Sequence, residues 1–230
     1  MKIQGLQKMT LLDYPGRVAC TVFLGGCDLR CPFCHNAELI DGTAPSVMEE
    51  YELLDFLRKR KSLLDGVAIT GGEPLLRGDL ASLLRPIRDL GYDIKLDTNG
   101  THPDRLRNLI DDALVQYVAM DIKNSPERYA ETAGVPAVDM TAIRNSVSLL
   151  LENRVPYEFR TTVVAEFHDE DSFRGIGPWI QGAERYYLQR FTDRETVPFE
   201  GFHAPAAEAM ETYAELVRPW VKAVSLRGVD

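Results

Sequence analysis

Short runs of apolar, β-branched and aromatic residues alternate along this chain with stretches in which apolar residues recur at helical spacing. The apolar runs are bounded by glycine or polar residues, a pattern that is typical of buried strands. They predict six strands, at Val18–Leu24, Gly66–Thr70, Asp93–Asp97, Val115–Ile122, Val155–Val164 and Arg185–Phe191.

The stretches between these runs predict helices. Apolar residues recur at helical spacing from Leu80 to Leu90 and stop at Gly91, a common residue just after a helix, and Pro86 is expected to kink this helix. Ser46, with Glu49 three residues later, has the form of a capping box and predicts a helix start. Further helices are expected at Pro103–Ile110, Thr141–Leu151, Ser172–Gln181 and Pro205–Val217.

This alternation predicts the fold class. Strands that are followed by helices of about ten residues form βα units around a parallel sheet. We therefore predict an α/β fold, a partial (β/α)6 TIM-like barrel with parallel strands and the helices outside. No repeat, low-complexity segment or linker interrupts the pattern, so we expect a single domain over residues 1–230.

Chemistry-bearing sequences follow four successive strands. A cysteine-rich loop follows the first strand, GGEP (Gly71–Pro74) the second, DTNG (Asp97–Gly100) the third and MDIK (Met120–Lys123) the fourth. Right-handed crossovers place the carboxyl ends of parallel strands on one face, where barrel-like α/β enzymes carry their active sites. The sequence therefore predicts a single site at this face.

The cysteines are the strongest chemical signal. All four, Cys20, Cys27, Cys31 and Cys34, lie within fifteen positions, whereas disulfide frameworks usually join distant segments. Three thiolates on one loop can bind three irons of a [4Fe–4S] cluster and leave the fourth iron open. The alternative is a structural zinc site with His35 or Cys20 as fourth ligand, although Cys20 lies inside the first strand, where a buried cysteine behaves as a small hydrophobe.

The composition argues against a disordered, nucleic-acid-binding or membrane-spanning protein. The chain has 230 residues, 45% of them hydrophobic and 27% charged, which is typical of a folded domain. Its net charge of −9 disfavours nucleic acid as a partner. The longest apolar run is Tyr117–Met120, too short for a membrane span, and the amino terminus lacks a signal-peptide pattern. We therefore expect a cytoplasmic protein without a membrane partner.

At this point the sequence resembles a known family. Cys27-Asp-Leu-Arg-Cys31-Pro-Phe-Cys34 has the cysteine spacing of the radical S-adenosylmethionine (SAM) enzymes, and GGEP stands where that family has its SAM-binding turn. Gly5–Gly16 (GLQKMTLLDYPG) and Cys34–Asn36 (CHN) resemble the activating enzymes of glycyl radical enzymes. Within that group, the chain is most similar to the activating proteins of anaerobic ribonucleoside-triphosphate reductase.

The resemblance implies a function. Cys27, Cys31 and Cys34 would hold a [4Fe–4S] cluster, and SAM would bind its open iron. One electron, supplied by a flavodoxin- or ferredoxin-type donor, would cleave SAM to methionine and a 5′-deoxyadenosyl radical, which generates a glycyl radical in a partner enzyme such as anaerobic ribonucleotide reductase. Two alternatives stay open: a radical SAM enzyme that acts on a small molecule, and a non-enzymatic iron–sulfur or zinc protein.

The resemblance also implies the residues that bind SAM. The glycines of GGEP let the backbone approach the ligand closely, and we expect this turn to be a segment separate from the cysteine loop. Asp97, Thr98 and Asp121 correspond to residues near the methionine end of SAM, with a bound monovalent cation. The implied cofactor-binding residues are Phe33, His35, Gly71, Gly72, Glu73, Asp97, Thr98, Asp121, Lys123 and Arg160. The alternative for Asp97 is a turn cap, and for Lys123 and Arg160 a solvated strand end.

The sequence departs from the relatives at one corner of the site. Pyruvate formate-lyase activating enzyme uses a histidine after the sixth strand, but Leu188–Thr192 contains none, which leaves Gln189 or Arg190 as substitutes. We expect the other histidines, His102, His168 and His203, to be solvated or capping residues. The chain lacks an additional cysteine-rich insert, which predicts a single cluster. Six strands would leave the barrel open on one side, and Val221–Leu226 is expected to pack on the core.

Overall fold

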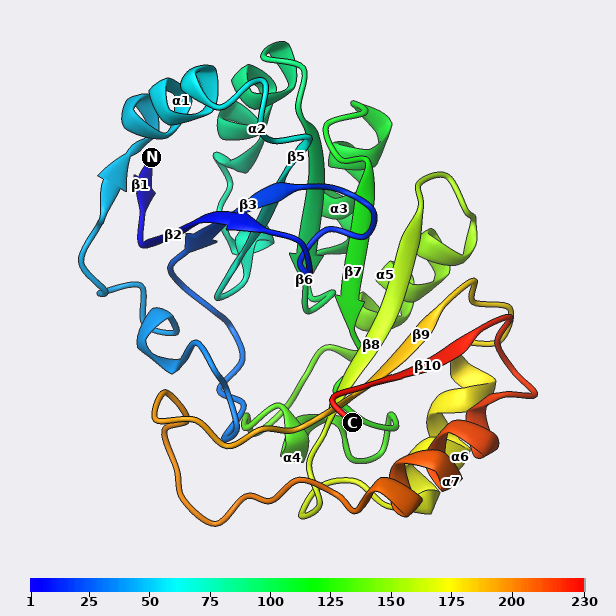
Figure 1. Cartoon of the computed structure of the whole chain (residues 1–230). Helices are drawn as coiled ribbons and strands as arrows, with labels where there is room; N and C mark the ends of the chain where they lie inside the picture. Colours follow the sequence, from blue (N-terminus) through cyan, green and yellow to red (C-terminus); the bar gives the residue numbers. More distant parts are fainter. Residues whose placement is uncertain (230) are drawn as a thin grey trace.

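The computed structural model of this chain describes residues 1–229. Its main sheet has eight strands in the order β10-β9-β8-β7-β6-β5-β3-β2 (Figure 1). All six predicted strands are present and pair in parallel. They are β3 (Ala19–Leu24), β5 (Gly66–Gly71), β6 (Asp93–Thr98), β7 (Tyr117–Asp121), β8 (Tyr157–Val163) and β9 (Tyr186–Arg190). The predicted α/β partial barrel is confirmed.

The number of strands differs from the prediction at both edges of the sheet. β2 (Gly5–Thr10) runs antiparallel to β3, and β10 (Val224–Arg227) runs parallel to β9. β2 mixes apolar and polar residues without an apolar run, and its central residues Gln7–Met9 are exposed, so the hydrophobic pattern did not predict this strand. Val221–Leu226 was predicted to pack on the core, and its end forms part of β10. Because β2 and β10 do not pair with each other, the barrel remains open over residues 1–229.

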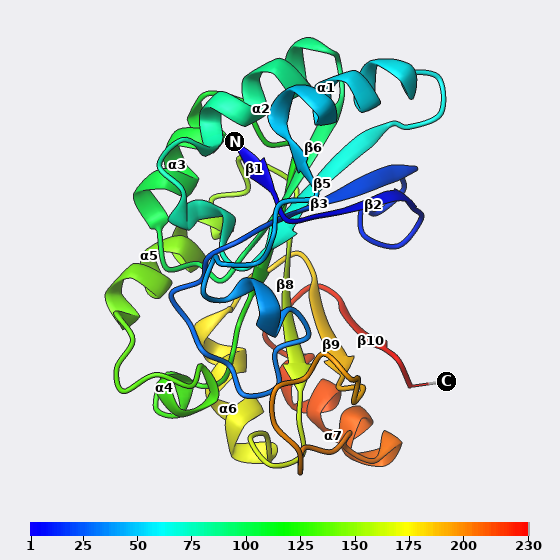
Figure 2. The same ribbon diagram turned by 90° about the vertical axis from the view of Figure 1, so that its left-hand side faces the viewer.

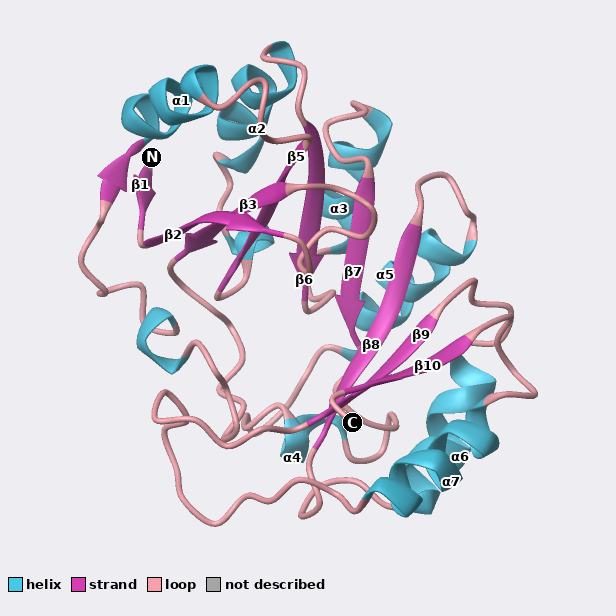
Figure 3. Cartoon of the chain, viewed as in Figure 1, coloured by secondary structure: helices cyan, strands magenta, loops and turns pink. Residues whose placement is uncertain are grey.

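Helices cover one face of the sheet (Figures 2 and 3). The predicted helices are α2 (Leu80–Asp89), α3 (Pro103–Asp111), α5 (Met140–Leu151), α6 (Glu170–Trp179) and α7 (Ala207–Val217), preceded by α1 (Glu50–Lys59). Short elements complete the fold: β1 (Lys2–Ile3) paired with β4 (Met48–Glu49), the 3-10 turns η1 (Ala37–Leu39) and η2 (Pro74–Leu76), and α4 (Tyr129–Thr132). Among the described residues, no helix combines the length and apolar character needed to cross a membrane.

The start of α1 corrects the sequence prediction. The capping box is formed by Glu49 and Glu52, and Ser46 lies before it. The Ser46 hydroxyl instead bonds to the carbonyl oxygens of Ile3 and Met48, because the segment between Ser46 and the helix is paired with β1. The predicted end of α2 is confirmed: the helix ends at Asp89, and Gly91 has a φ of +79°.

The alternation of side chains along each strand separates the core from the cavity. Cys20, Val22 and Leu24 of β3 belong to the core on the helix side, and each is fully buried. Burial raises the pKa of the Cys20 thiol to about 12, as expected for a cysteine that serves as a small hydrophobe. Thr21 and Phe23 alternate with them and line a cavity on the opposite side. The cavity side of the neighbouring strands likewise carries polar side chains, such as Thr70 of β5 and Asp97 of β6.

Candidate active site

A cavity of about 440 Å³ opens at the carboxyl ends of the parallel strands. This volume lies within the roughly 300–1,000 Å³ that is usual for small-molecule sites. Its wall contains all three cysteines of the loop, Cys27, Cys31 and Cys34. It also contains nine of the ten other predicted site residues, namely Phe33, His35, Gly71, Gly72, Asp97, Thr98, Asp121, Lys123 and Arg160. Only the Glu73 side chain does not line it.

The cysteine loop is held by backbone hydrogen bonds. The Gly26 N–H donates to the Leu39 carbonyl at 2.7 Å, and the Cys27 N–H donates to the Ile40 carbonyl at 2.9 Å. On its other side, the Arg30 N–H donates to the Ala133 carbonyl at 2.9 Å, just after α4. The loop is therefore fixed between η1 and the end of α4.

The three loop thiols are free of disulfides and differ in exposure. Cys31 is buried, whereas Cys27 and Cys34 are partly exposed. Burial raises the pKa of each thiol, that of Cys27 to about 12, and the Lys123 ammonium acts in the opposite direction on all three. A nearby cation favours the thiolate form, which is the form that ligates a metal.

The GGEP turn packs directly on the cysteine loop. A Cβ atom at Gly72 would lie 2.1 Å from the Gly26 carbonyl oxygen and 3.2 Å from the Cys27 Cβ. Gly71 has a φ of +128°, and a Cβ there would lie 2.1 Å from the Leu24 carbonyl oxygen. Both positions therefore require glycine. The turn and the loop are separate segments of the chain, as expected, but they are not independent of each other, because they are in direct contact.

Glu73 joins the turn to the DTNG segment from behind the cavity. Its carboxyl group accepts hydrogen bonds from the Leu75 N–H at 2.9 Å, the Thr98 hydroxyl at 2.9 Å and the Asn99 N–H at 2.6 Å. Burial raises the pKa of Glu73 to about 8, and these three donors act in the opposite direction. Its side chain therefore positions residues of the cavity wall and does not itself reach the cavity.

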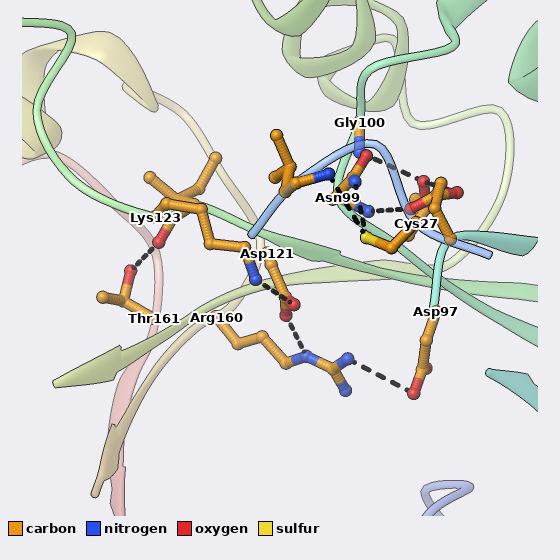
Figure 4. Close-up of polar contacts among 12 residues, drawn as sticks. Cys27, Asp97, Asn99, Gly100, Asp121, Lys123, Arg160 and Thr161 are labelled. Carbon is orange, nitrogen blue, oxygen red and sulfur yellow. Dashed lines mark hydrogen bonds and ion pairs between the residues drawn. The ribbon is translucent and has the colours of Figure 1, made fainter. Parts of the chain in front are cut away.

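Alternating charges form a partly buried chain along the cavity wall (Figure 4). Arg160 lies between two carboxylates: its Nη2 is 3.2 Å from Asp97 Oδ2, and its Nε is 2.5 Å from Asp121 Oδ1. Lys123 Nζ lies 2.8 Å from Asp121 Oδ2, and Lys95 Nζ is paired with Asp97 Oδ1. Burial favours the neutral acids, but the neighbouring cations prevail and lower the pKa of Asp97 and of Asp121. Both carboxyl groups are therefore ionised.

The aromatic corner of the site lies beside the last cysteine. The His35 ring stacks on Phe191 with centroids 5.5 Å apart, and its Nε2 lies 2.7 Å from the Thr192 carbonyl oxygen. Of the two residues expected to replace the missing histidine, Gln189 lines the cavity. Arg190 does not line it, because its Nε donates to the Pro205 carbonyl at 2.7 Å.

His168 differs from the sequence prediction. It is buried, and the Val164 N–H donates to its Nδ1 at 3.1 Å. Its Nε2 therefore carries the proton and donates to the Lys123 carbonyl at 2.8 Å. Burial lowers the pKa of His168 to about 4. His203, by contrast, is exposed and pairs with Glu166, and His102 stands at the start of α3.

Sequence reasoning missed several residues of the wall. Asn99 donates to Asp28 Oδ1 at 2.8 Å and lies 4.0 Å from Cys27 Sγ, beside which Figure 4 shows it. Asn36 donates to the Gly71 carbonyl at 3.1 Å. The signal for both was present, since they belong to the DTNG and CHN segments. Asp13 also lines the wall and belongs to the Gly5–Gly16 segment. Lys95, which pairs with Asp97 of the wall, lies in no motif.

The sequence of residues 21–172 matches the model of the Radical SAM superfamily, a span that includes the cysteine loop and the following three strand-end motifs. This chain belongs to the radical SAM superfamily. The cofactors of this superfamily are a [4Fe–4S] cluster and SAM.

Individual relatives of this radical SAM protein differ in their named activities. A Methanocaldococcus jannaschii protein, provisionally named a glycyl-radical enzyme activating enzyme, is 28% identical over 237 residues, which is 99% of this chain and 96% of that one. The pyruvate formate-lyase-activating enzyme of Clostridium pasteurianum is 34% identical over 104 residues, 43% of each chain. A 7-carboxy-7-deazaguanine synthase of Thermococcus kodakarensis is 25% identical over 225 residues, 88% of this chain and 83% of that one.

Solved structures share the fold of this radical SAM protein. A domain of pyruvate-formate lyase-activating enzyme from Bacteroides vulgatus has a TM-score of 0.58 at 18% identity, covering 71% of this chain and 99% of that one. Streptococcus suis SuiB bound to S-adenosylmethionine has a TM-score of 0.67 at 14% identity, covering 90% of this chain and 52% of that one. These likenesses concern the arrangement of the strands and helices.

The residues of the cavity suit the superfamily's cofactors. Within residues 1–229, no group of three His, Cys, Asp or Glu side chains is arranged around a single metal ion. A cubane cluster requires a wider arrangement of thiolates than a single ion does, because each thiolate binds a different iron. Cys27, Cys31 and Cys34 suit such a cluster, since all three are free thiols on the wall of one cavity. The same wall offers glycine backbone and both signs of charge for a zwitterionic ligand.

Proposed function

We propose that this radical SAM enzyme is an activase that generates a glycyl radical in a partner enzyme. The observation that carries the proposal is the similarity to the Methanocaldococcus jannaschii activating enzyme, which extends over 99% of this chain. The open barrel supports it, because Gln7 and Asp13, at and beyond the edge strand β2, line the cavity. A loop of a partner protein could reach the cavity along this edge.

In this proposal, Cys27, Cys31 and Cys34 would hold the [4Fe–4S] cluster, and its fourth iron would be left for SAM. When bound, the cluster supplies the electron that cleaves SAM to methionine and a 5′-deoxyadenosyl radical. The backbone of Gly71 and Gly72 approaches the methionine moiety. Glu73 holds Thr98 and Asn99 in place behind it.

The charged chain is proposed to bind the amino-acid end of SAM. Arg160 and Lys123 attract its carboxylate, and Asp97 and Asp121, which pair with these two cations, hold them in position. Because these carboxylates fix the position of Arg160 and Lys123, the two cations need little movement to meet a carboxylate. Phe33 and His35 are proposed to flank the adenine, on the side where His35 stacks on Phe191.

The partner and the electron donor are proposed on the resemblance alone. Gly5–Gly16 and Cys34–Asn36 resemble the activating proteins of anaerobic ribonucleotide reductase, and this enzyme is the partner we propose. A flavodoxin- or ferredoxin-type protein would supply the electron. Residues 1–230 would act as one domain with one cluster.

A second candidate function is modification of a small molecule. The similarity to 7-carboxy-7-deazaguanine synthase covers 88% of this chain. The long connection from β9 to α7 also reaches the cavity, where Arg194 lines its wall.

Electron paramagnetic resonance separates the two functions. The anaerobically reconstituted and reduced protein is mixed with SAM and anaerobic ribonucleotide reductase, with natural or deuterated glycine. We expect a glycyl radical doublet that collapses in the deuterated sample, with deuterium recovered in 5′-deoxyadenosine. SAM cleavage without a radical on this partner, or on other glycyl radical enzymes, would favour the small-molecule function.

A further inference from the structure

Lys95 is a buried cation in the middle of β6. It is 2% exposed and shares the cavity side of the strand with Asp93 and Asp97, because side chains alternate along a strand. Asp93 is already paired with Arg17 at 2.6 Å and with Arg88 at 3.1 Å. The Lys95 ammonium is paired with Asp97, which belongs to the charged chain of the SAM site.

The resemblance implies a monovalent cation held by Asp97, Thr98 and Asp121, and the structure tests whether these residues suit one. Each of the four carboxylate oxygens is paired with a side-chain cation: Lys95 and Arg160 take those of Asp97, and Arg160 and Lys123 take those of Asp121. The Thr98 hydroxyl donates to Glu73 at 2.9 Å and accepts from the Gly100 N–H at 3.1 Å. The implied ligands are therefore already engaged.

The sum of the charges around Asp97 and Asp121 also argues against a bound monovalent cation. Two partly buried carboxylates stand against the buried Lys95 and two partly buried cations, so this cluster carries a net positive charge. A further K⁺ or Na⁺ would add to an excess of positive charge in a partly buried site, which is unfavourable. The residues present do not fit an additional monovalent cation.

We propose that the Lys95 ammonium replaces the monovalent cation in this chain. This ammonium belongs to a side chain of β6, so it does not have to bind from solution as a free ion would. It holds Asp97 ionised and oriented toward Arg160. SAM binding and thermal stability should then be independent of the alkali cation in solution. This inference concerns the SAM site and holds for a protein partner or a small-molecule substrate alike.

The test compares alkali cations at constant ionic strength. The reconstituted protein is placed in chloride salts of K⁺, Na⁺ or tetramethylammonium, and SAM affinity is measured by equilibrium dialysis. The melting temperature without SAM gives a second readout. We expect equal Kd values and equal melting temperatures in all three salts. A SAM affinity that K⁺ or Na⁺ raises about tenfold over tetramethylammonium, equivalent to ~1.4 kcal/mol, would overturn the proposal.

Two variants sharpen this test. Lys95→Met removes the ammonium but keeps a long unbranched side chain, so SAM affinity should become dependent on K⁺ or Na⁺, which can enter beside Asp97. Lys59→Met, at an exposed position at the end of α1, is the matched control and should behave as the parent. A folded Lys95→Met protein that binds SAM as the parent does in every salt would contradict the proposal. If Lys95→Met does not fold, the salt comparison on the parent protein decides.

Discussion

The backbone N–H of Glu73 donates a hydrogen bond to the carbonyl oxygen of Gly26 at 2.7 Å. Gly26 directly precedes the first cysteine of the loop, and Glu73 belongs to the GGEP turn. The Gly72 N–H adds a second connection, to the Leu24 carbonyl at 2.8 Å. The proposed cluster loop and SAM turn are thus one hydrogen-bonded unit, and a change in one should affect the other.

Gly72→Ala is expected to reduce both iron content and SAM affinity. The added Cβ would lie 2.1 Å from the Gly26 carbonyl oxygen, so the loop that carries Cys27 must move. Iron analysis and equilibrium dialysis measure the two effects. Gly78→Ala is the matched control, because a Cβ at Gly78 meets no atom within 4 Å. Full iron content combined with weak SAM binding in Gly72→Ala would mean that the turn and loop respond independently.

Replacing any one of Cys27, Cys31 and Cys34 by Ala should abolish the cluster, because two thiolates cannot hold it. The protein should stay folded, since the loop is fixed by backbone hydrogen bonds to Leu39, Ile40 and Ala133. Iron content and circular dichroism measure the two properties. Cys20→Ala is the control within the same chain and should keep its iron, because Cys20 lies in the core. Loss of iron in Cys20→Ala would contradict this ligand set.

Much of this site could be predicted from the sequence, because motifs at successive strand ends must meet in a parallel α/β fold. The strand pattern brought Cys27, Gly72, Asp97 and Asp121 to one cavity wall. What could not be predicted depends on side-chain contacts between strands that lie far apart in the chain. The buried position of Lys95 is an example, since a lysine in a strand is ordinarily solvated.

Glu73→Ala is expected to destabilise the protein by about 2–4 kcal/mol, since it leaves two buried N–H groups and the Thr98 hydroxyl without an acceptor. SAM affinity should fall as well, because Thr98 and Asn99 lose their common anchor. Urea unfolding measures the first effect and equilibrium dialysis the second. Glu211→Ala, on the exposed side of α7, is the control and should leave both unchanged. Unchanged stability in Glu73→Ala would argue that the carboxyl group is dispensable for this corner.

His168 predicts a specific dependence of stability on pH. Its pKa is lowered from 6.5 to about 4 in the folded protein. Between these values the unfolded chain binds more protons, so this histidine lowers the stability as the pH falls from 6.5 to 4. Its contribution is complete above pH 6.5 and amounts to about 3 kcal/mol. Glu73, with its raised pKa of about 8, contributes a slope of opposite sign, so the parent alone cannot isolate His168.

The variant His168→Gln isolates this effect. The amide can donate to the Lys123 carbonyl and accept from the Val164 N–H, as the neutral imidazole does, but it does not titrate. Free energies of unfolding from urea titrations at pH 7 and pH 4.5 give the slope. The loss of stability at the lower pH should be smaller in the variant. Equal losses in both proteins would show that His168 does not carry this dependence.

Three exposed apolar side chains stand between the cavity-lining residues Gln7 and Asp13. Met9, Leu11 and Leu12 are 63%, 69% and 90% exposed, and they belong to the end of β2 and the turn that follows. Exposed apolar groups beside a functional cavity are typical of contact sites for other proteins. Under the proposed function, a partner enzyme would cover them when its glycine loop enters the cavity.

Leu12→Ser should therefore reduce the yield of glycyl radical on the partner about fivefold or more, the loss of one buried apolar anchor. SAM cleavage by the reduced protein alone should stay at the parental rate, because Leu12 does not line the cavity. Spin quantitation and chromatography of 5′-deoxyadenosine measure the two quantities. Leu63→Ser, at another exposed leucine in the turn after α1, is the matched control and should preserve both. A parental radical yield from Leu12→Ser would contradict the assignment of Leu12 as an apolar anchor for the partner enzyme.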